Sequence, residues 1–107
     1  MNPPELVVIG PIAYAVSIEP AMDEHTDDTV GRISYTKGKI QLSPSLAPDA
    51  TADVLIHEVL HGVLYNVGEH ELNSNEGLVD RVGSALLATL LYSPGLLEYL
   101  EAVRDGE

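Results

Sequence analysis

The chain contains no cysteine, phenylalanine or tryptophan. Without cysteine it can form no disulfide, and a metal site would have to be built from histidine and carboxylate ligands. The interior must be built from Leu, Val, Ile and Ala with five tyrosines, and the length of 107 residues suits one domain spanning 1–107. The longest apolar stretch, 82–97, is interrupted by Ser93-Pro94-Gly95, so no membrane-spanning helix is predicted.

Basic residues are scarce as well, with 5 lysines and arginines against 17 acidic residues and a formal net charge of −12. Binding nucleic acid through phosphate contacts needs clustered basic side chains, so this composition argues against it. The densest acidic segment, 19–28, lacks the glycine and closing glutamate of an EF-hand and is predicted to be a solvated loop. No signal-peptide pattern is evident, and we expect a cytoplasmic protein, with its oligomeric state open.

The pentad His57-Glu58-Val59-Leu60-His61 matches H-E-x-x-H inside a stretch with the pattern of a buried amphipathic helix. Residues four apart share one face of a helix, so both imidazoles can reach a single metal ion. Glu58 would lie beside that metal, where a general base for water belongs. The alternative is a core helix that happens to carry two histidines, one of them satisfied by a neighbouring carboxylate.

A third ligand is available in the segment that follows. Glu76 and Asp80 lie one helical turn apart at the start of a second apolar-periodic run. Glu76 would complete a set of two histidines and one glutamate, and Asp80 would accept the second ring N–H of His57. Alternatively, Glu76 simply favours a helix N-terminus that Asn73 caps. His70 is another possible third ligand, although an exposed loop histidine is the favoured interpretation.

H-E-x-x-H followed by N-E-x-x-x-D at 75–80 resembles the gluzincin metallopeptidases, of which the thermolysin-like enzymes are a branch. The resemblance covers about 53–90. It implies one zinc ion per chain held by His57, His61 and Glu76. It also implies that Glu58 activates water and that Asp80 orients a zinc-bound histidine. The chain is similar, too, to the very small H-E-x-x-H proteins of phage genomes and to the ImmA/IrrE-type regulatory peptidases, in which a few strands precede the metal helix.

The chain departs from the thermolysin-like pattern in several places. Val79 stands where those enzymes usually have serine, and most of their substrate-binding domain has no counterpart. That missing part includes the His and Tyr that steady the tetrahedral intermediate. The candidates for this task here are Tyr35, Tyr65, His25 and His70, each of which could equally be a packing or surface residue. The metzincin variant is excluded because its further ligand positions hold Leu64 and Val67.

The order of predicted elements indicates an α+β fold. Strands are predicted at 6–9, 13–18, 32–35 and 39–42, with Gly38 in the turn of the last hairpin. Helices are predicted from about 48, over 75–92, and from 93 onward. We therefore expect a minimal zincin-like fold. In it, a small, mostly antiparallel sheet of three or four strands packs on the H-E-x-x-H helix and a second ligand-bearing helix, and a short C-terminal helix follows. By resemblance, an edge strand of the hairpin 32–43 would pair with an extended substrate.

These observations favour a zinc-dependent metallopeptidase-like protein that hydrolyses a peptide bond of a peptide or protein substrate. The metal would activate a water molecule, with Glu58 as general base. Two alternatives stay open. In the first, the domain is metal-stabilised or catalytically degenerate and serves as a protein-binding module. In the second, it binds no metal and its histidines are ordinary core residues.

Overall fold

The strands of the molecule precede its helices along the chain. The computed structural model describes residues 1–24 and 29–107. Within these ranges the strands are β1 (Leu6–Ile9), β2 (Ile12–Ile18), β3 (Gly31–Ser34) and β4 (Lys39–Leu42), with a short 3-10 helix, η1 (Pro20–Glu24), after β2. The helices α1 (Pro48–Asn66), α2 (His70–Asn73), α3 (Glu76–Leu91) and α4 (Pro94–Arg104) follow. The predicted α+β class is confirmed.

The strands form one mixed sheet in the order β1-β2-β4-β3. Two antiparallel hairpins, β1–β2 and β3–β4, turn at Gly10 and Gly38, which have φ of 56° and 63°. Glycine adopts this left-handed conformation without the steric penalty of a Cβ atom. The hairpins join through a parallel pairing of β2 with β4, in which Val16 lies opposite Ile40. Two of the three pairings are thus antiparallel, and β3 forms one edge of the sheet.

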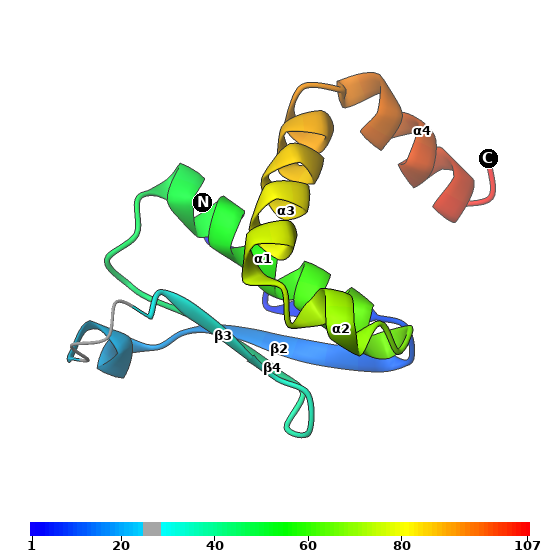
Figure 1. Ribbon diagram of the computed structural model, residues 1–107. Helices are drawn as coiled ribbons and strands as arrows, with labels where there is room; N and C mark the ends of the chain where they lie inside the picture. Colours follow the sequence, from blue (N-terminus) through cyan, green and yellow to red (C-terminus); the bar gives the residue numbers. More distant parts are fainter. Residues whose placement is uncertain (25–28) are drawn as a thin grey trace.

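Helix α1 lies across one face of the sheet (Figure 1). Alternate strand residues point toward it and form the core, whose buried members are Ile9, Tyr14, Ile40, Leu42 and Leu55. The close approach depends on Gly62, because a Cβ atom there would lie 2.6 Å from Cδ1 of Ile9 and 3.1 Å from Cδ1 of Ile33. Burial of this apolar face is the main contribution that holds α1 on the sheet.

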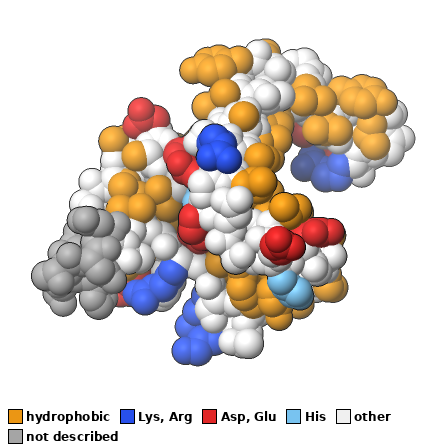
Figure 2. All heavy atoms as spheres, in the orientation of Figure 1, with side chains coloured by type: hydrophobic (Ala, Val, Ile, Leu, Met, Phe, Trp, Pro, Cys, Tyr) orange, Lys and Arg blue, Asp and Glu red, His pale blue; other side chains and the backbone are white. Residues whose placement is uncertain are grey.

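Helices α3 and α4 project away from the sheet (Figure 1). Helix α3 crosses α1 with only Val79 and Gly83 buried, and α4 packs against α3 without burying any side chain. A Cβ atom at Gly83 would lie 3.6 Å from Cα of His57, so the two helix backbones are close at this crossing. Hydrophobic side chains remain exposed along both helices (Figure 2). Among the described residues, no helix is both long and apolar enough to span a membrane.

Candidate metal centre

The H-E-x-x-H residues and the predicted third ligand lie on two helices. His57, Glu58 and His61 lie within about one turn of α1, and Glu76 is the first residue of α3. Asn75, rather than the predicted Asn73, caps α3, because its side chain accepts a hydrogen bond from the amide of Leu78 at 3.1 Å. The chain between the two helices is short enough to return Glu76 to the histidine face of α1.

The nitrogen and oxygen atoms expected to bind metal converge. Nε2 of His57 and Nε2 of His61 are 3.2 Å apart. The two carboxylate oxygens of Glu76 lie 3.1 Å from the former and 2.9 Å from the latter. Tetrahedral zinc with bonds of about 2.0–2.1 Å has ligand atoms about 3.3 Å apart, so this spacing fits such an ion. His57, His61 and Glu76 are therefore the residues that can hold a metal.

The second nitrogen of each ring faces a hydrogen-bond acceptor. Nδ1 of His61 lies 2.6 Å from Oδ1 of Asn73, whose amide nitrogen donates to the Tyr35 hydroxyl at 3.0 Å. Nδ1 of His57 lies 3.7 Å from Oδ1 of Asp80, the predicted orienting carboxylate, which is near the ring but beyond hydrogen-bond distance. A ring that carries its proton on Nδ1 presents a lone pair at Nε2. With these tautomers, two imidazole lone pairs and a carboxylate point at one another, and the three groups could hold a metal ion between them.

Glu58 is buried beside this cluster. Only 6% of the residue is exposed, and among the described residues none forms a hydrogen bond with its carboxylate. Burial raises the pKa of the Glu58 carboxyl above its ordinary value, and the neighbouring His57 and His61 partly oppose this shift. A carboxylate with a raised pKa beside a metal site is well suited to accept a proton from water and to return it.

A groove of about 310 Å³ runs between the cluster and the edge strand β3, and its lining includes Gly31, Arg32, Ile33 and Tyr35. The amide of Ser43 donates to the carbonyl of Val30 at 2.9 Å. In an antiparallel ladder the hydrogen-bonded pairs alternate, so the peptide groups of Gly31 and Ile33 are directed away from β4. The groove thus has an open strand edge on one side and the candidate metal centre on the other.

The other candidates lie at the margin of the site or away from it. Tyr35 lines the groove, and its ring stacks on that of Tyr65 with centroids 4.0 Å apart. His70 packs edge-on against Tyr65 at 6.1 Å and is not part of the ligand cluster found among the described residues. His25 and part of the acidic segment 19–28 lie outside the described residues. Asn73 was missed as a site residue, although a polar residue between two ligand-bearing helices was a possible signal.

Comparisons with known proteins assign no relative to the chain. No protein-family model matches it, no curated protein matches it, and no solved structure matches it. The functional interpretation therefore rests on the residues and on their geometry.

Proposed function

We propose that the protein is a zinc-dependent, peptidase-like hydrolase of the gluzincin type. The observation that carries the proposal is the convergence of both histidine Nε2 atoms and the Glu76 carboxylate, with Asn73 and Asp80 facing the opposite ring nitrogens. When both rings carry their proton on Nδ1, the two Nε2 lone pairs and the carboxylate favour a cation between them. His57, His61 and Glu76 would hold one zinc ion per chain. When bound, zinc lowers the pKa of a water molecule toward neutrality and polarises a carbonyl group.

The residues around the ligands suit hydrolysis of a peptide bond. Glu58, buried and without a donor, would take a proton from water and deliver it to the leaving amine. An extended peptide would pair with the outward-directed peptide groups of Gly31 and Ile33, which places its backbone along the groove. The Tyr35 hydroxyl accepts a hydrogen bond from the side-chain amide of Asn73. Its own proton is therefore available to donate a hydrogen bond to a developing oxyanion.

A second candidate function uses the same metal for structure. Helix α3 buries only Val79 and Gly83 against the rest of the molecule. A zinc ion shared by Glu76 and the two histidines of α1 would secure it, and the domain would then be a metal-stabilised binding module. The first proposal, that of a hydrolase, includes a peptide or protein as substrate and a cytoplasmic location.

Elemental analysis and a peptidase assay separate these possibilities. We expect about one zinc per chain in untagged protein, lost in Glu76→Ala and retained in the matched variant His70→Ala. Glu58→Gln should retain zinc while the rate of peptide hydrolysis falls at least about a hundredfold. Zinc binding without any hydrolysis would favour the binding module. An absence of stoichiometric zinc, even after zinc is supplied, would contradict both.

A further inference from the structure

A second, smaller pocket opens next to the candidate metal centre. It has a volume of about 170 Å³ and lies between the start of β3, helix α1 and the first turns of α3. It shares Gly31, His57 and Glu58 with the groove along β3. Pockets that hold a whole drug-sized ligand measure about 300–1,000 Å³, so this one suits a single side chain. A side chain that enters it would belong to a residue whose backbone lies beside Glu58.

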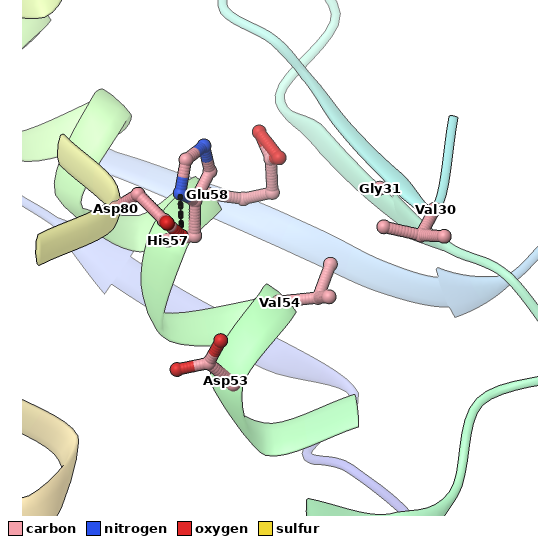
Figure 3. Close-up of a pocket in the computed structure, with 7 residues that line it drawn as sticks. All are labelled: Val30, Gly31, Asp53, Val54, His57, Glu58 and Asp80. Atoms are coloured by element: carbon pink, nitrogen blue, oxygen red, sulfur yellow. Dashed lines mark ion pairs between the residues drawn. The ribbon is translucent and has the colours of Figure 1, made fainter. Parts of the chain in front are cut away.

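The walls of this pocket combine apolar and acidic groups (Figure 3). Val54 of α1 and Val30, which precedes β3, supply the apolar surface, and Asp53 and Asp80 supply two carboxylates. Figure 3 shows Asp53 and Asp80 on the helical side and Val30 across the pocket on the strand side. Lysine and arginine have the matching shape, because an aliphatic stem carries a cationic end.

The carboxylate of Asp53 has no basic partner among the described residues. Asp53 accepts one hydrogen bond from the Ser84 hydroxyl, at 2.8 Å, which holds its carboxylate in place without neutralising it. No lysine or arginine lines the pocket, and no described basic residue forms an ion pair with Asp53. Glu58, which is 6% exposed, also lines the pocket. Carboxylates that line one pocket give it a negative potential, which attracts a cation.

We propose that this pocket binds a lysine or arginine side chain of the substrate, next to the bond that is cleaved. The proposal rests on the proposed peptidase function for the identity of the ligand as a peptide residue. Asp53 is then the specificity-determining residue, because Asp80 also faces His57 and Glu58 acts on water. Peptides with an apolar side chain of similar length would bind through Val30 and Val54 alone.

Binding can be tested without catalysis. The probes are capped pentapeptides Ala-Ala-X-Ala-Ala, with X as lysine, norleucine or glutamate, added to zinc-loaded Glu58→Gln protein. The methyl NMR signals of Val30 and Val54 report occupancy. We expect the lysine peptide to bind about fivefold more tightly than the norleucine peptide, which is the size of one part-exposed charge pair. The glutamate peptide should bind more weakly than either, and 0.5 M NaCl should reduce the differences.

Asp53→Asn is the decisive variant, because asparagine keeps an acceptor for Ser84 and removes the charge. It should abolish the preference for lysine over norleucine and leave the affinity for the norleucine peptide unchanged. Asp49→Asn, one turn earlier on α1, exposed and outside the pocket, is the matched control and should retain the preference. Equal binding of lysine and norleucine peptides, or a preference that survives Asp53→Asn, would overturn the proposal.

A cleavage assay with the same peptides in wild-type protein separates this proposal from the one on which it rests. Cleavage of all peptides at equal rates would contradict the proposed lysine pocket but would support the proposed peptidase function. Lysine-selective binding that Asp53→Asn abolishes, without cleavage of any peptide, would support the pocket as a binding site and count against the peptidase.

Discussion

Nδ1 of His61 lies 2.6 Å from Oδ1 of Asn73, which links a candidate metal ligand on α1 to the last residue of α2. The amide nitrogen of Asn73 donates to the Tyr35 hydroxyl, so the acceptor oxygen is held toward the ring. Partners of this kind set the tautomer of a ligand histidine and increase its basicity. Asn73 is therefore a closer partner for His61 than Asp80 is for His57, whose Nδ1 lies 3.7 Å from the Asp80 carboxylate.

The first prediction follows from this contact. Asn73→Ala should weaken zinc affinity by about tenfold or more, because His61 loses the acceptor that keeps its proton on Nδ1. Asn73→Asp should keep the affinity within a few fold, since a carboxylate is also an acceptor. Competition with a chromophoric chelator measures both. Equal affinities for wild-type protein and Asn73→Ala would show that this hydrogen bond does not support the site.

Gly31 sits where the groove and the lysine pocket meet. A Cβ atom there would clash with Cγ1 of Val54 and lie 3.4 Å from Oε2 of Glu58. We expect Gly31→Ala to retain zinc while peptide hydrolysis falls by about tenfold or more, because the methyl group obstructs the approach of the substrate backbone. Gly95→Ala, where a Cβ atom has no neighbour within 4 Å, is the control. Loss of zinc from Gly31→Ala would instead indicate a disturbed fold.

The two buried helix glycines should respond differently to alanine. In Gly62→Ala the new methyl group would press on Ile9 and Ile33, and we expect a loss of about 1–2 kcal/mol in the free energy of unfolding. At Gly83 the nearest atom would be 3.6 Å away, an ordinary contact. Gly83→Ala should therefore be neutral or stabilising by up to about 1 kcal/mol, the gain in helix propensity. Urea unfolding of both variants measures the difference, and destabilisation of Gly83→Ala comparable to that of Gly62→Ala would contradict it.

Burial of Glu58 should make metal-free protein sensitive to pH. Because the pKa of this carboxyl is higher in the folded than in the unfolded chain, the folded state holds the proton more tightly. Stability is then full below the ordinary pKa of 4.5 and falls as pH rises toward the higher folded pKa. Glu58→Gln should therefore be more stable than wild type at pH 7, with the advantage shrinking as pH falls to 4. Urea unfolding of metal-free protein tests this, with the exposed Glu69→Gln as control, and a constant advantage across this range would refute it.

Chelation should loosen α3 more than the sheet. Removing zinc would leave the first turns of α3 held by the capping residue Asn75, by burial of Val79 and by the polar contacts of Glu76 with the two histidines, without the metal that joins them. In hydrogen exchange we expect the amides of α2 and of the first turns of α3 to lose protection on chelation, while β2 and β4 keep theirs. Glu76→Gln protein should show the loosened pattern with or without zinc. Uniform protection in both states would argue against a zinc link between the helices.

Local patterns predicted most of the elements. The strand 39–42 is observed with its predicted bounds, and the helices predicted from about 48, over 75–92 and from 93 appear as α1, α3 and α4 within a residue or two. Turns at glycine and apolar periodicity are properties of neighbouring residues, and a single sequence displays them directly. For the same reason the H-E-x-x-H spacing was sufficient to place His57 and His61 on one face.

Features that depend on distant residues were not predicted. The parallel pairing of β2 with β4 joins Val16 to Ile40 across the acidic segment, and nothing local indicates its direction. The same holds for Asn73, which reaches both His61 and Tyr35 because α2 folds back against α1. Asp53 offered no signal either, since its partner Ser84 lies on another helix.

Helix α3 is buried against α1 only near its middle, so it can tilt about that contact as a rigid rod. Its buried residues, Val79 and Gly83, form the pivot at the crossing with α1. With about 1.5 Å of rise per residue, Glu76 lies roughly 7 Å from the middle of this pivot, and the end of α3 that carries α4 lies roughly 15 Å beyond it. A sideways push on α4 would therefore move Glu76 in the opposite direction, by about half as much. Movement of the exposed helix α4 would in this way be transmitted to Glu76, one of the three residues that would hold the metal.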